Sequence, residues 1–184
     1  MILRLFDVLF SLIGLLLSAP LLVVLFLVGL LDSGSPLFIQ VRVGRNQKPF
    51  NLVKFRTMAI GTKSVATHLS SPASITRFGR FLRGSKLDEL PQLWNVLKGE
   101  MSLVGPRPNL LNQEVLIEER DKRGVYQALP GITGLAQVQE IDMSTPELLA
   151  DTDARMISEM SIANYFKYIV LTVLGGGSGD RVKN

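Results

Sequence analysis

The sequence contains no cysteine and a single histidine, which excludes several kinds of site. Without thiols the chain has no disulfide, no thiolate nucleophile and no cysteine-ligated zinc. The histidine, His68, lies in a Ser/Thr/Ala-rich stretch without a partner motif, and we interpret it as a loop residue. Any chemistry must therefore use carboxylates, hydroxyl groups, Lys or Arg, with or without a hard metal ion.

Acidic residues are also missing from a long central stretch. No Asp or Glu occurs between Asp32 and Asp88, and residues 33–107 carry 12 basic residues against three acidic ones. The net charge of the whole chain is only +4, because residues 108–184 hold an acidic excess. A basic block of this kind attracts the phosphates of a nucleotide, a lipid headgroup or a nucleic acid, although a solvated basic surface explains it equally simply.

An uncharged run near the N-terminus predicts a membrane element. Residues 8–31 would extend about 36 Å as one helix, enough to cross a hydrocarbon core of roughly 30 Å. A cleaved signal peptide is disfavoured, because its apolar region is usually only about 7–15 residues long and because Arg4 is offset here by Asp7.

The sequence "SAP" at residues 18–20 predicts a break in the middle of this run. Pro20 removes one helical hydrogen bond, and Ser18 can bond a carbonyl that is freed. Each half is then too short to cross a membrane alone. A kinked spanning helix and a helix–break–helix that enters and leaves by the same face both fit, and the basic block that follows belongs on the cytoplasmic side.

Two short strands and a helix are predicted next. The segments "PLFIQVRVG" and "FNLVKFRTM" alternate around the turn "RNQKP", which places Ile39, Val41 and Val43 on one face and Phe38, Gln40 and Arg42 on the other. Residues 59–75 are rich in Ser, Thr and Ala and indicate a loop or a lid. In "SITRFGRFLRGSKL" an arginine recurs at every third position, so a helix would present a basic stripe to lipid headgroups or phosphates: Arg77, Arg80 and Arg83.

Two adjacent carboxylates, Asp88 and Glu89, end the acid-free region. Apolar residues at helical spacing predict an amphipathic helix from about residue 88 to Gly99: Leu87, Leu90, Trp94 and Leu97. Pro91 is tolerated only in a first turn, which places Asp88 at or next to the N-cap and Glu89 in the first turn. There the free N–H groups favour ionised carboxylates and also an incoming phosphate.

Helix capping alone could explain these two acids, but their surroundings favour a functional role. They follow 55 residues without an acid, a membrane element precedes them, and "VGPRP" follows at residues 104–108. Pro106 and Pro108 fix Arg107 in a stiff turn, which suits a guanidinium aimed at a phosphate. A carboxylate among arginines, close to phosphate and Mg²⁺, can act as a nucleophile at phosphorus.

The rest of the chain predicts one loop, two helices and a tail. "LPGITGLAQ" is a Gly/Pro turn with Thr133 and Gln137 as polar contacts. A helix begins at Ser144, Pro146 and Glu147, which have capping-box spacing. Residues 162–174 indicate a buried or interface-lying helix that is too short to span a membrane, and residues 175–184 a flexible tail.

These segments together resemble the monotopic phosphoglycosyl transferases, the bacterial sugar transferase family, in its minimal catalytic form. The resemblance covers most of residues 3–138 and is carried by four motifs: "RLFDVLFSLIGLLLSAPLLV", "VRVGRNQKPFNLVKFRTM", "FGRFLRGSKLDELPQLWNVLKGEMSLVGPRP" and "LPGITGLAQV". It implies transfer of a sugar phosphate from a UDP-sugar to polyprenyl (undecaprenyl) phosphate with release of UMP. This is the first membrane step of O-antigen, capsule, exopolysaccharide or glycoprotein glycan assembly, on the cytoplasmic face of the bacterial inner membrane.

The resemblance also implies roles for individual residues. Asp88 would be the nucleophile that forms a covalent phosphosugar intermediate and a ligand of Mg²⁺, and Glu89 would support the metal and proton handling. Other residues would bind substrate phosphates (Arg83, Arg107, Lys54 and Arg56) or form a substrate loop (Thr133 and Gln137). The break at Ser18 and Pro20 would make the membrane helix re-entrant. The chain departs from the family at Leu129, where Arg is common, and at "AQVQEID".

We therefore expect a mainly α protein with a small β-hairpin. The expected parts are a re-entrant helix–break–helix (1–34), a catalytic domain (35–140), C-terminal helices on the domain and the membrane interface (141–174) and a flexible tail (175–184). Expected partners are a UDP-sugar, polyprenyl phosphate and the bilayer, with no nucleic acid; a homo-oligomer is left open. The alternatives are a non-catalytic basic membrane protein that binds anionic lipid or nucleic acid, and a structural membrane anchor.

Overall fold

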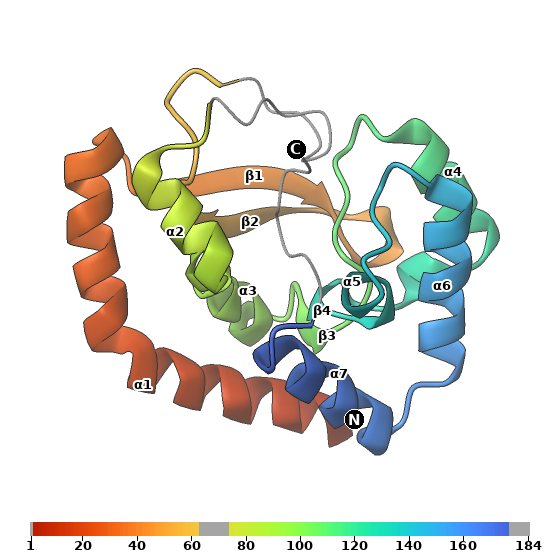
Figure 1. The fold of residues 1–184 in the computed structure, drawn as a ribbon. Coiled ribbons are helices and arrows are strands. Elements are labelled where there is room, and N and C mark those ends of the chain that lie inside the picture. Colours follow the sequence, from red (N-terminus) through yellow and green to blue (C-terminus); the bar gives the residue numbers. More distant parts are fainter. Residues whose placement is uncertain (1, 63–73, 177–184) are drawn as a thin grey trace.

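The computed structural model describes residues 2–62 and 74–176. Its helices and strands are α1 (Ile2–Ser33), β1 (Leu37–Val43), β2 (Pro49–Phe55), α2 (Arg77–Ser85), α3 (Gln92–Lys98), β3 (Ser102–Val104), α4 (Glu114–Lys122), β4 (Gly131–Thr133), α5 (Leu135–Val138), α6 (Pro146–Ser158) and α7 (Ile162–Val173) (Figure 1). A mostly helical protein with small sheets and one long apolar N-terminal helix is thereby confirmed. Most of the predicted loop at residues 59–75, with His68, and most of the predicted tail lie outside the described residues.

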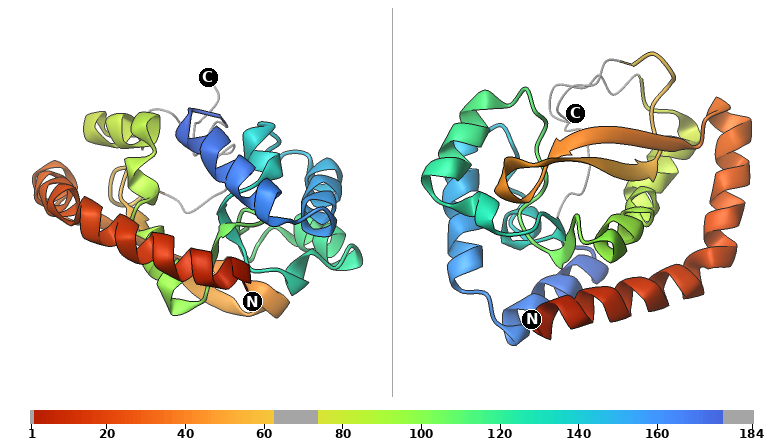
Figure 2. Two further views of the ribbon diagram at one scale, coloured as in Figure 1. Left: turned by 90° about the horizontal axis from the view of Figure 1, so that it is seen from below. Right: turned by 180° about the vertical axis from the view of Figure 1, so that it is seen from behind.

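Helix α1 is long, apolar and bent near its middle, as Figures 1 and 2 show from several sides. Among the described residues it is the one helix long and apolar enough to cross a membrane, judged by length and composition. Pro20 lies inside α1, so the predicted break is a bend within one continuous helix. The Ser18 hydroxyl donates to the Gly14 carbonyl (2.6 Å), whereas Pro20 deprives the Leu16 carbonyl of its helical donor. Ser18 therefore does not bond the carbonyl that Pro20 frees, as was predicted, but one two residues earlier in the chain.

The predicted hairpin is confirmed, with β1 and β2 antiparallel and Leu37 opposite Phe55. Its inner face buries charged side chains together with the apolar Leu52. Ile39 is 60% exposed on the outer face, whereas Arg42 and Lys54 are buried on the inner one. Burying these two charges is costly unless they serve a polar site, so their placement indicates a polar site at the middle of the molecule.

A second, parallel pair of strands was not predicted. β3 and β4 pair with Ser102 opposite Gly131 and Val104 opposite Thr133. The two backbones approach so closely that a Cβ on Gly131 would lie 2.0 Å from the Gly105 nitrogen, so only glycine fits at this crossing. The "LPGITG" segment is thus a strand as well as a turn, and it joins the "VGPRP" segment.

Both arms of α1 pack against the same globular part of the protein. In the first arm, Asp7 accepts hydrogen bonds from the Ser102 hydroxyl (2.9 Å) at β3 and from the Tyr165 hydroxyl (2.8 Å) on α7. In the second arm, Leu25 belongs to a buried cluster with Phe55 and Leu82. The bend therefore lets one helix follow two sides of the globular part (Figure 1).

The helix that follows residue 141 begins differently from the prediction. Thr145 is the N-cap of α6 and Pro146 occupies the first turn, without a side-chain capping bond. The predicted capping box from Ser144 is therefore wrong: the Ser144 backbone N–H and hydroxyl both donate to the Asp142 carboxylate. The fixed φ of Pro146 suits a first turn, and its missing N–H leaves one donor fewer to be capped.

Candidate functional site

Asp88 and Glu89 lie on a short 3₁₀ turn, Leu87–Glu89, ahead of α3. Helix α3 begins at Gln92 with Pro91 as its N-cap, so the predicted position of Asp88 at the N-cap of this helix is wrong. The reason is Pro91, which has no N–H to donate to the Leu87 carbonyl. That carbonyl accepts instead from the Leu90 N–H (3.3 Å), which tightens the chain into the 3₁₀ turn.

The two carboxylates are buried, unlike ordinary capping residues on a helix surface. Asp88 is 1% and Glu89 9% exposed. Glu89 Oε1 accepts a hydrogen bond from Arg107 Nη2 at 3.1 Å. Burying a carboxylate costs free energy that a capping role on the surface would not incur, so this placement favours a role in a site.

Arg107 and the inner face of the hairpin enclose one pocket. Its lining includes Arg107, Arg42 from β1, Lys54 from β2 and Gln92 from α3. The structure thus brings the predicted Glu89, Arg107 and Lys54 together and adds Arg42, which the sequence analysis did not select. A signal for Arg42 existed, because strand alternation places it on the face that also carries Phe38 and Gln40.

Arg83 is the inward member of the predicted arginine stripe. It is buried in the last turn of α2, and its Nε donates to Thr57 Oγ1 (2.8 Å). Arg77 and Arg80 are exposed, so the stripe does not act as one surface. Gly79 allows the close approach behind this contact, since a Cβ there would lie 2.0 Å from the Thr57 carbonyl oxygen.

Arg56 is placed away from the pocket. Its guanidinium donates to the Ser35 carbonyl (2.7 Å) and the Leu37 carbonyl (3.2 Å), and lies 5.3 Å from the centre of the Phe38 ring. These contacts hold the segment that joins α1 to β1. The phosphate-binding role that was expected of Arg56 stays a prediction that this geometry does not favour.

The substrate-loop residues lie beside the end of α7. Thr133 Oγ1 makes a short contact with Thr172 Oγ1 of α7, and the Gln137 carboxamide is buried without a hydrogen-bond partner among the described residues. Lys86, which precedes the 3₁₀ turn of the two acids, donates to the Gly176 carbonyl (2.7 Å). The end of α7 therefore contacts both the carboxylate turn and the "PGITG" strand, a meeting that the sequence did not reveal.

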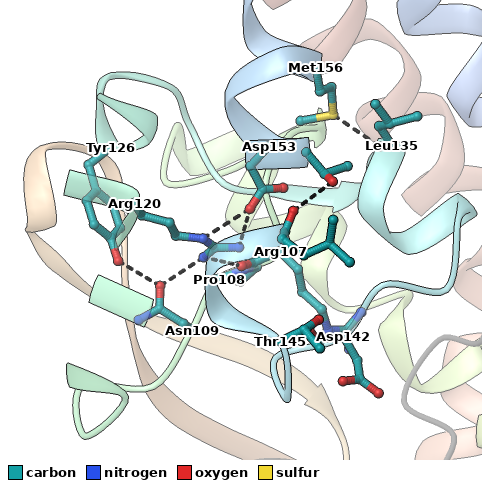
Figure 3. Close-up of polar contacts among 12 residues, drawn as sticks. Arg107, Pro108, Asn109, Arg120, Tyr126, Leu135, Asp142, Thr145, Asp153 and Met156 are labelled. Atoms are coloured by element: carbon teal, nitrogen blue, oxygen red, sulfur yellow. Dashed lines mark hydrogen bonds and ion pairs between the residues drawn. The ribbon is translucent and has the colours of Figure 1, made fainter. Parts of the chain in front are cut away.

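A buried ion pair lies behind the Arg107 turn, as Figure 3 shows. Arg120 of α4 and Asp153 of α6 are joined by a contact of 2.7 Å, and their side chains are almost wholly enclosed. Burial raises the pKa of the Asp153 carboxyl, and Arg120 opposes that rise. This pair was missed because the sequence analysis made no prediction for residues 109–128.

The chemistry of the two carboxylates is compatible with the Mg²⁺ ion that the resemblance implies, provided that a substrate shares it. No group of three or more His, Asp or Glu that could hold a metal occurs in the parts of the chain that the structure describes. Mg²⁺ usually binds through one or two carboxylates together with substrate phosphates and water, rather than in an all-protein cage. Asp88 and Glu89 provide such a carboxylate pair next to cationic side chains.

The sequence of this chain matches known proteins over most of its length. The family model described as bacterial sugar transferase matches residues 1–176. The "Uncharacterized sugar transferase EpsL" of Bacillus subtilis is 39% identical over 173 residues, which cover 92% of this chain and 84% of that protein. The "UDP-glucose:undecaprenyl-phosphate glucose-1-phosphate transferase" of Caulobacter vibrioides is 38% identical over 182 residues, which cover 92% of this chain and 67% of that protein.

Other relatives are much longer than this chain. The "Undecaprenyl-phosphate galactose phosphotransferase" of Salmonella typhimurium is 37% identical over 162 residues, which cover 77% of this chain but 34% of that protein. The chain thus spans about a third of the length of some relatives and most of the length of others. Since the family model matches nearly its whole length, the chain belongs to the bacterial sugar transferase family.

Proposed function

We propose that this protein transfers a sugar phosphate from a UDP-sugar to polyprenyl phosphate, most simply undecaprenyl phosphate, and releases UMP. The observation that carries the proposal is the pair of buried carboxylates, Asp88 and Glu89, next to Arg107 and a pocket lined by further cations. The names of the Caulobacter and Salmonella relatives, both of which include undecaprenyl phosphate, support the same reaction.

Asp88 is the proposed nucleophile. Its carboxylate oxygen attacks the phosphorus that bears the sugar, a P–O bond forms, and the bond to UMP breaks so that UMP leaves with the electron pair. An oxygen of polyprenyl phosphate then attacks the same phosphorus, the bond to Asp88 breaks, and the carboxylate is restored. The burial of Asp88 keeps bulk water from a covalent intermediate that water would otherwise hydrolyse.

The cations of the site bind the phosphates in this proposal. Arg107 offers a planar fork to a phosphate, with Lys54 and Arg42 in the same pocket and Arg83 close to the carboxylate turn. Mg²⁺, when bound by Asp88 with Glu89 beside it, would neutralise part of the diphosphate charge. Glu89 holds Arg107 in place through its 3.1 Å contact before the substrate binds.

The proposed membrane arrangement is re-entrant, with the globular part on the cytoplasmic face. It is supported by the packing of both arms of α1 against one globular part, through Asp7 in the first arm and Leu25 in the second. A helix that crossed the bilayer would have its two ends on opposite sides, and one globular part could not contact both arms in water. The acceptor, a lipid phosphate, would then meet the site at the membrane surface, at the first membrane step of glycan assembly.

One assay separates this function from its rivals. The purified protein in lipid nanodiscs is mixed with undecaprenyl phosphate, Mg²⁺ and each of a panel of UDP-sugars, and UMP release is measured. We expect release with at least one donor, dependent on both the lipid phosphate and Mg²⁺. A basic membrane protein that only binds anionic lipid or nucleic acid, or a structural anchor, would release no UMP with any donor.

A further inference from the structure

The turn that carries Arg107 has few backbone donors of its own. Pro106 and Pro108 restrict φ but have no N–H to donate, so most hydrogen bonds that hold the turn reach its carbonyl oxygens from elsewhere. All three consecutive carbonyls accept such a bond. Gly131 N–H donates to Pro106 (2.9 Å), Arg120 Nη1 to Arg107 (2.8 Å) and Arg42 Nη1 to Pro108 (3.0 Å).

Arg120 is itself fixed by a buried set of acceptors (Figure 3). Its Nε and Nη2 donate to Asp153 Oδ2 at 3.1 and 2.7 Å, and its Nη1 also donates to Asn109 Oδ1 at 2.9 Å. The Tyr126 hydroxyl donates to the same Asn109 oxygen at 3.0 Å. The guanidinium therefore has one orientation, in which Nη1 points to the Arg107 carbonyl.

A role in packing alone does not explain this arrangement. Burying a charged pair costs desolvation energy, and apolar residues of similar size would join α4 to α6 at least as well. A second ion pair lies one turn away, between Arg123 at the C-cap of α4 and the exposed Asp151 of α6, and it contacts none of the site residues in the described structure. The buried pair differs because Arg120 also donates to the Arg107 carbonyl. The side chain of Arg107 in turn contacts Glu89.

We infer that Arg120, held in place by its ion pair with Asp153, is a positioning residue that orients the Arg107 guanidinium toward the substrate phosphates. The part of this inference that involves substrate phosphates rests on the proposed function. The positioning of Arg107 by Arg120 involves only residues of this chain and does not depend on that function. Lysine cannot replace Arg120, because one ammonium group cannot reach Asp153, Asn109 and the Arg107 carbonyl in the fixed plane that the guanidinium provides.

The kinetic test compares Arg120→Lys with Arg123→Lys, a matched control at the C-cap of α4. We expect Arg120→Lys to lower kcat about ten- to hundredfold, as for a catalytic group displaced by a fraction of an ångström, and Arg123→Lys to leave kcat within about twofold. The decisive comparison adds Arg107→Ala, assayed at high enzyme concentration. If Arg120 acts through Arg107, then Arg120→Lys changes the rate less than about twofold in the Arg107→Ala background. If the rate losses of Arg120→Lys and Arg107→Ala multiply in the double variant, the inference is overturned. The same holds if Arg120→Lys alone keeps the wild-type rate.

A second measurement does not depend on turnover. Hydrogen exchange followed by mass spectrometry reports on the Gly131 N–H, which binds the Pro106 carbonyl, and the Val43 N–H, which binds the Asn109 carbonyl. We expect Arg120→Lys to speed exchange at least tenfold in peptides that contain these amides, and to leave the β2 amides unchanged. Asp153→Asn, which keeps one acceptor, should cause a smaller change in the same peptides.

The outcomes separate the two proposals. Unchanged exchange at Gly131 and Val43, or faster exchange throughout the protein, would overturn positioning whatever the kinetics show. If no UDP-sugar supports UMP release by the unmodified protein, the proposed function fails, and a localised change in exchange would still establish that Arg120 holds the turn.

Discussion

Asp88 and Glu89 are neighbours in the chain but meet different surroundings. Glu89 contacts Arg107, whereas Asp88 is the more deeply buried of the two and lies at the centre of the 3₁₀ turn. Their proposed roles differ accordingly, since a nucleophile must keep a carboxylate oxygen for phosphorus while a supporting group can hold an arginine.

Replacing Asp88 by asparagine should abolish turnover without unfolding the protein. The amide has nearly the same size as the carboxylate but loses the charge that attacks phosphorus and binds a metal ion. UMP release is the measurement, with thermal unfolding as the control for folding. Turnover above roughly a hundredth of the wild-type rate would argue against a covalent role.

The Glu89→Gln variant should be severely impaired as well, and UMP release is again the measurement. A near-normal rate would mean that Glu89 has only a structural role.

The Arg107→Lys variant tests whether the guanidinium fork matters. Lysine keeps the positive charge but offers no planar pair of donors, so we expect kcat/KM to fall at least tenfold, or about 1.4 kcal/mol in transition-state stabilisation. Lys98→Arg, a change at the exposed end of α3, serves as a control for altered surface cations. Equal activity of Arg107→Lys and wild type would mean that charge alone suffices at this position.

At the scale of elements, periodicity predicted the strands and helices better than their buried faces. The hairpin has the predicted alternation, yet Ile39 faces outward and Arg42 inward. In α3 the predicted apolar stripe contains Trp94, which is 56% exposed, whereas the polar Asn95 is buried. The two exceptions have separate causes. Arg42 lines the pocket and donates to the Pro108 carbonyl, whereas Asn95 accepts from the Val53 N–H and donates to the Asn51 carbonyl of β2.

Helix α7 is joined to the membrane helix by a hydrogen bond that can be tested singly. Asp7 Oδ1 accepts from the Tyr165 hydroxyl (2.8 Å), the Ser102 hydroxyl (2.9 Å) and the Leu103 N–H (2.9 Å). Tyr165→Phe removes one donor from a buried carboxylate and should lower the free energy of unfolding by about 1–3 kcal/mol. The measurement is thermal unfolding in detergent.

Tyr168→Phe is the matched control for that experiment. Tyr168 is also buried on α7, but its hydroxyl makes no hydrogen bond to the residues that the structure describes. We expect its unfolding temperature to stay close to that of the wild type. If the two variants unfolded at the same temperature, Asp7 would not be a significant link between α1 and α7.

At the scale of the whole molecule, the membrane topology can be read by cysteine labelling, because the chain has no cysteine of its own. Single cysteines at the exposed positions 2 and 32 mark the two ends of α1. In the re-entrant arrangement both are protected from an impermeant reagent in intact cells, and both react after lysis. Replacing Ser18 and Pro20 by Ala and Leu should straighten α1 and expose position 2 outside, because the bend loses its cause. Labelling of position 2 in intact cells with the bend intact would contradict the re-entrant arrangement.

The single tryptophan gives a second test of how the protein lies on the bilayer. Trp94 is exposed on α3, which packs against α1, and aromatic side chains of this kind favour the membrane interface. We expect lipids brominated near their carbonyl groups to quench its fluorescence, and iodide in solution to have little effect. Efficient iodide quenching in nanodiscs would place this face of α3 in water.

The sequence by itself determined the elements whose causes are local. Strand alternation and turn residues predicted the hairpin, the length and apolarity of residues 8–31 predicted the membrane helix, and the prolines around Arg107 predicted a stiff turn. The motifs alone also identify Asp88 and Arg107 as candidate site residues. The helix start near Asp88 was misplaced because Pro91 affects two consecutive turns, and the helical pattern does not reveal which of them begins the α-helix.

Only the tertiary structure decided which residues meet. The pairing of β3 with β4 joins residues 29 positions apart, and the contacts of Arg120 with the Arg107 carbonyl and with Asp153 join three segments of the chain. Asp7 and Tyr165 are 158 positions apart. Such contacts depend on how whole elements pack, because the free energy of burying a charge or closing a turn is set by partners that are remote in sequence and leave no periodic signal in it.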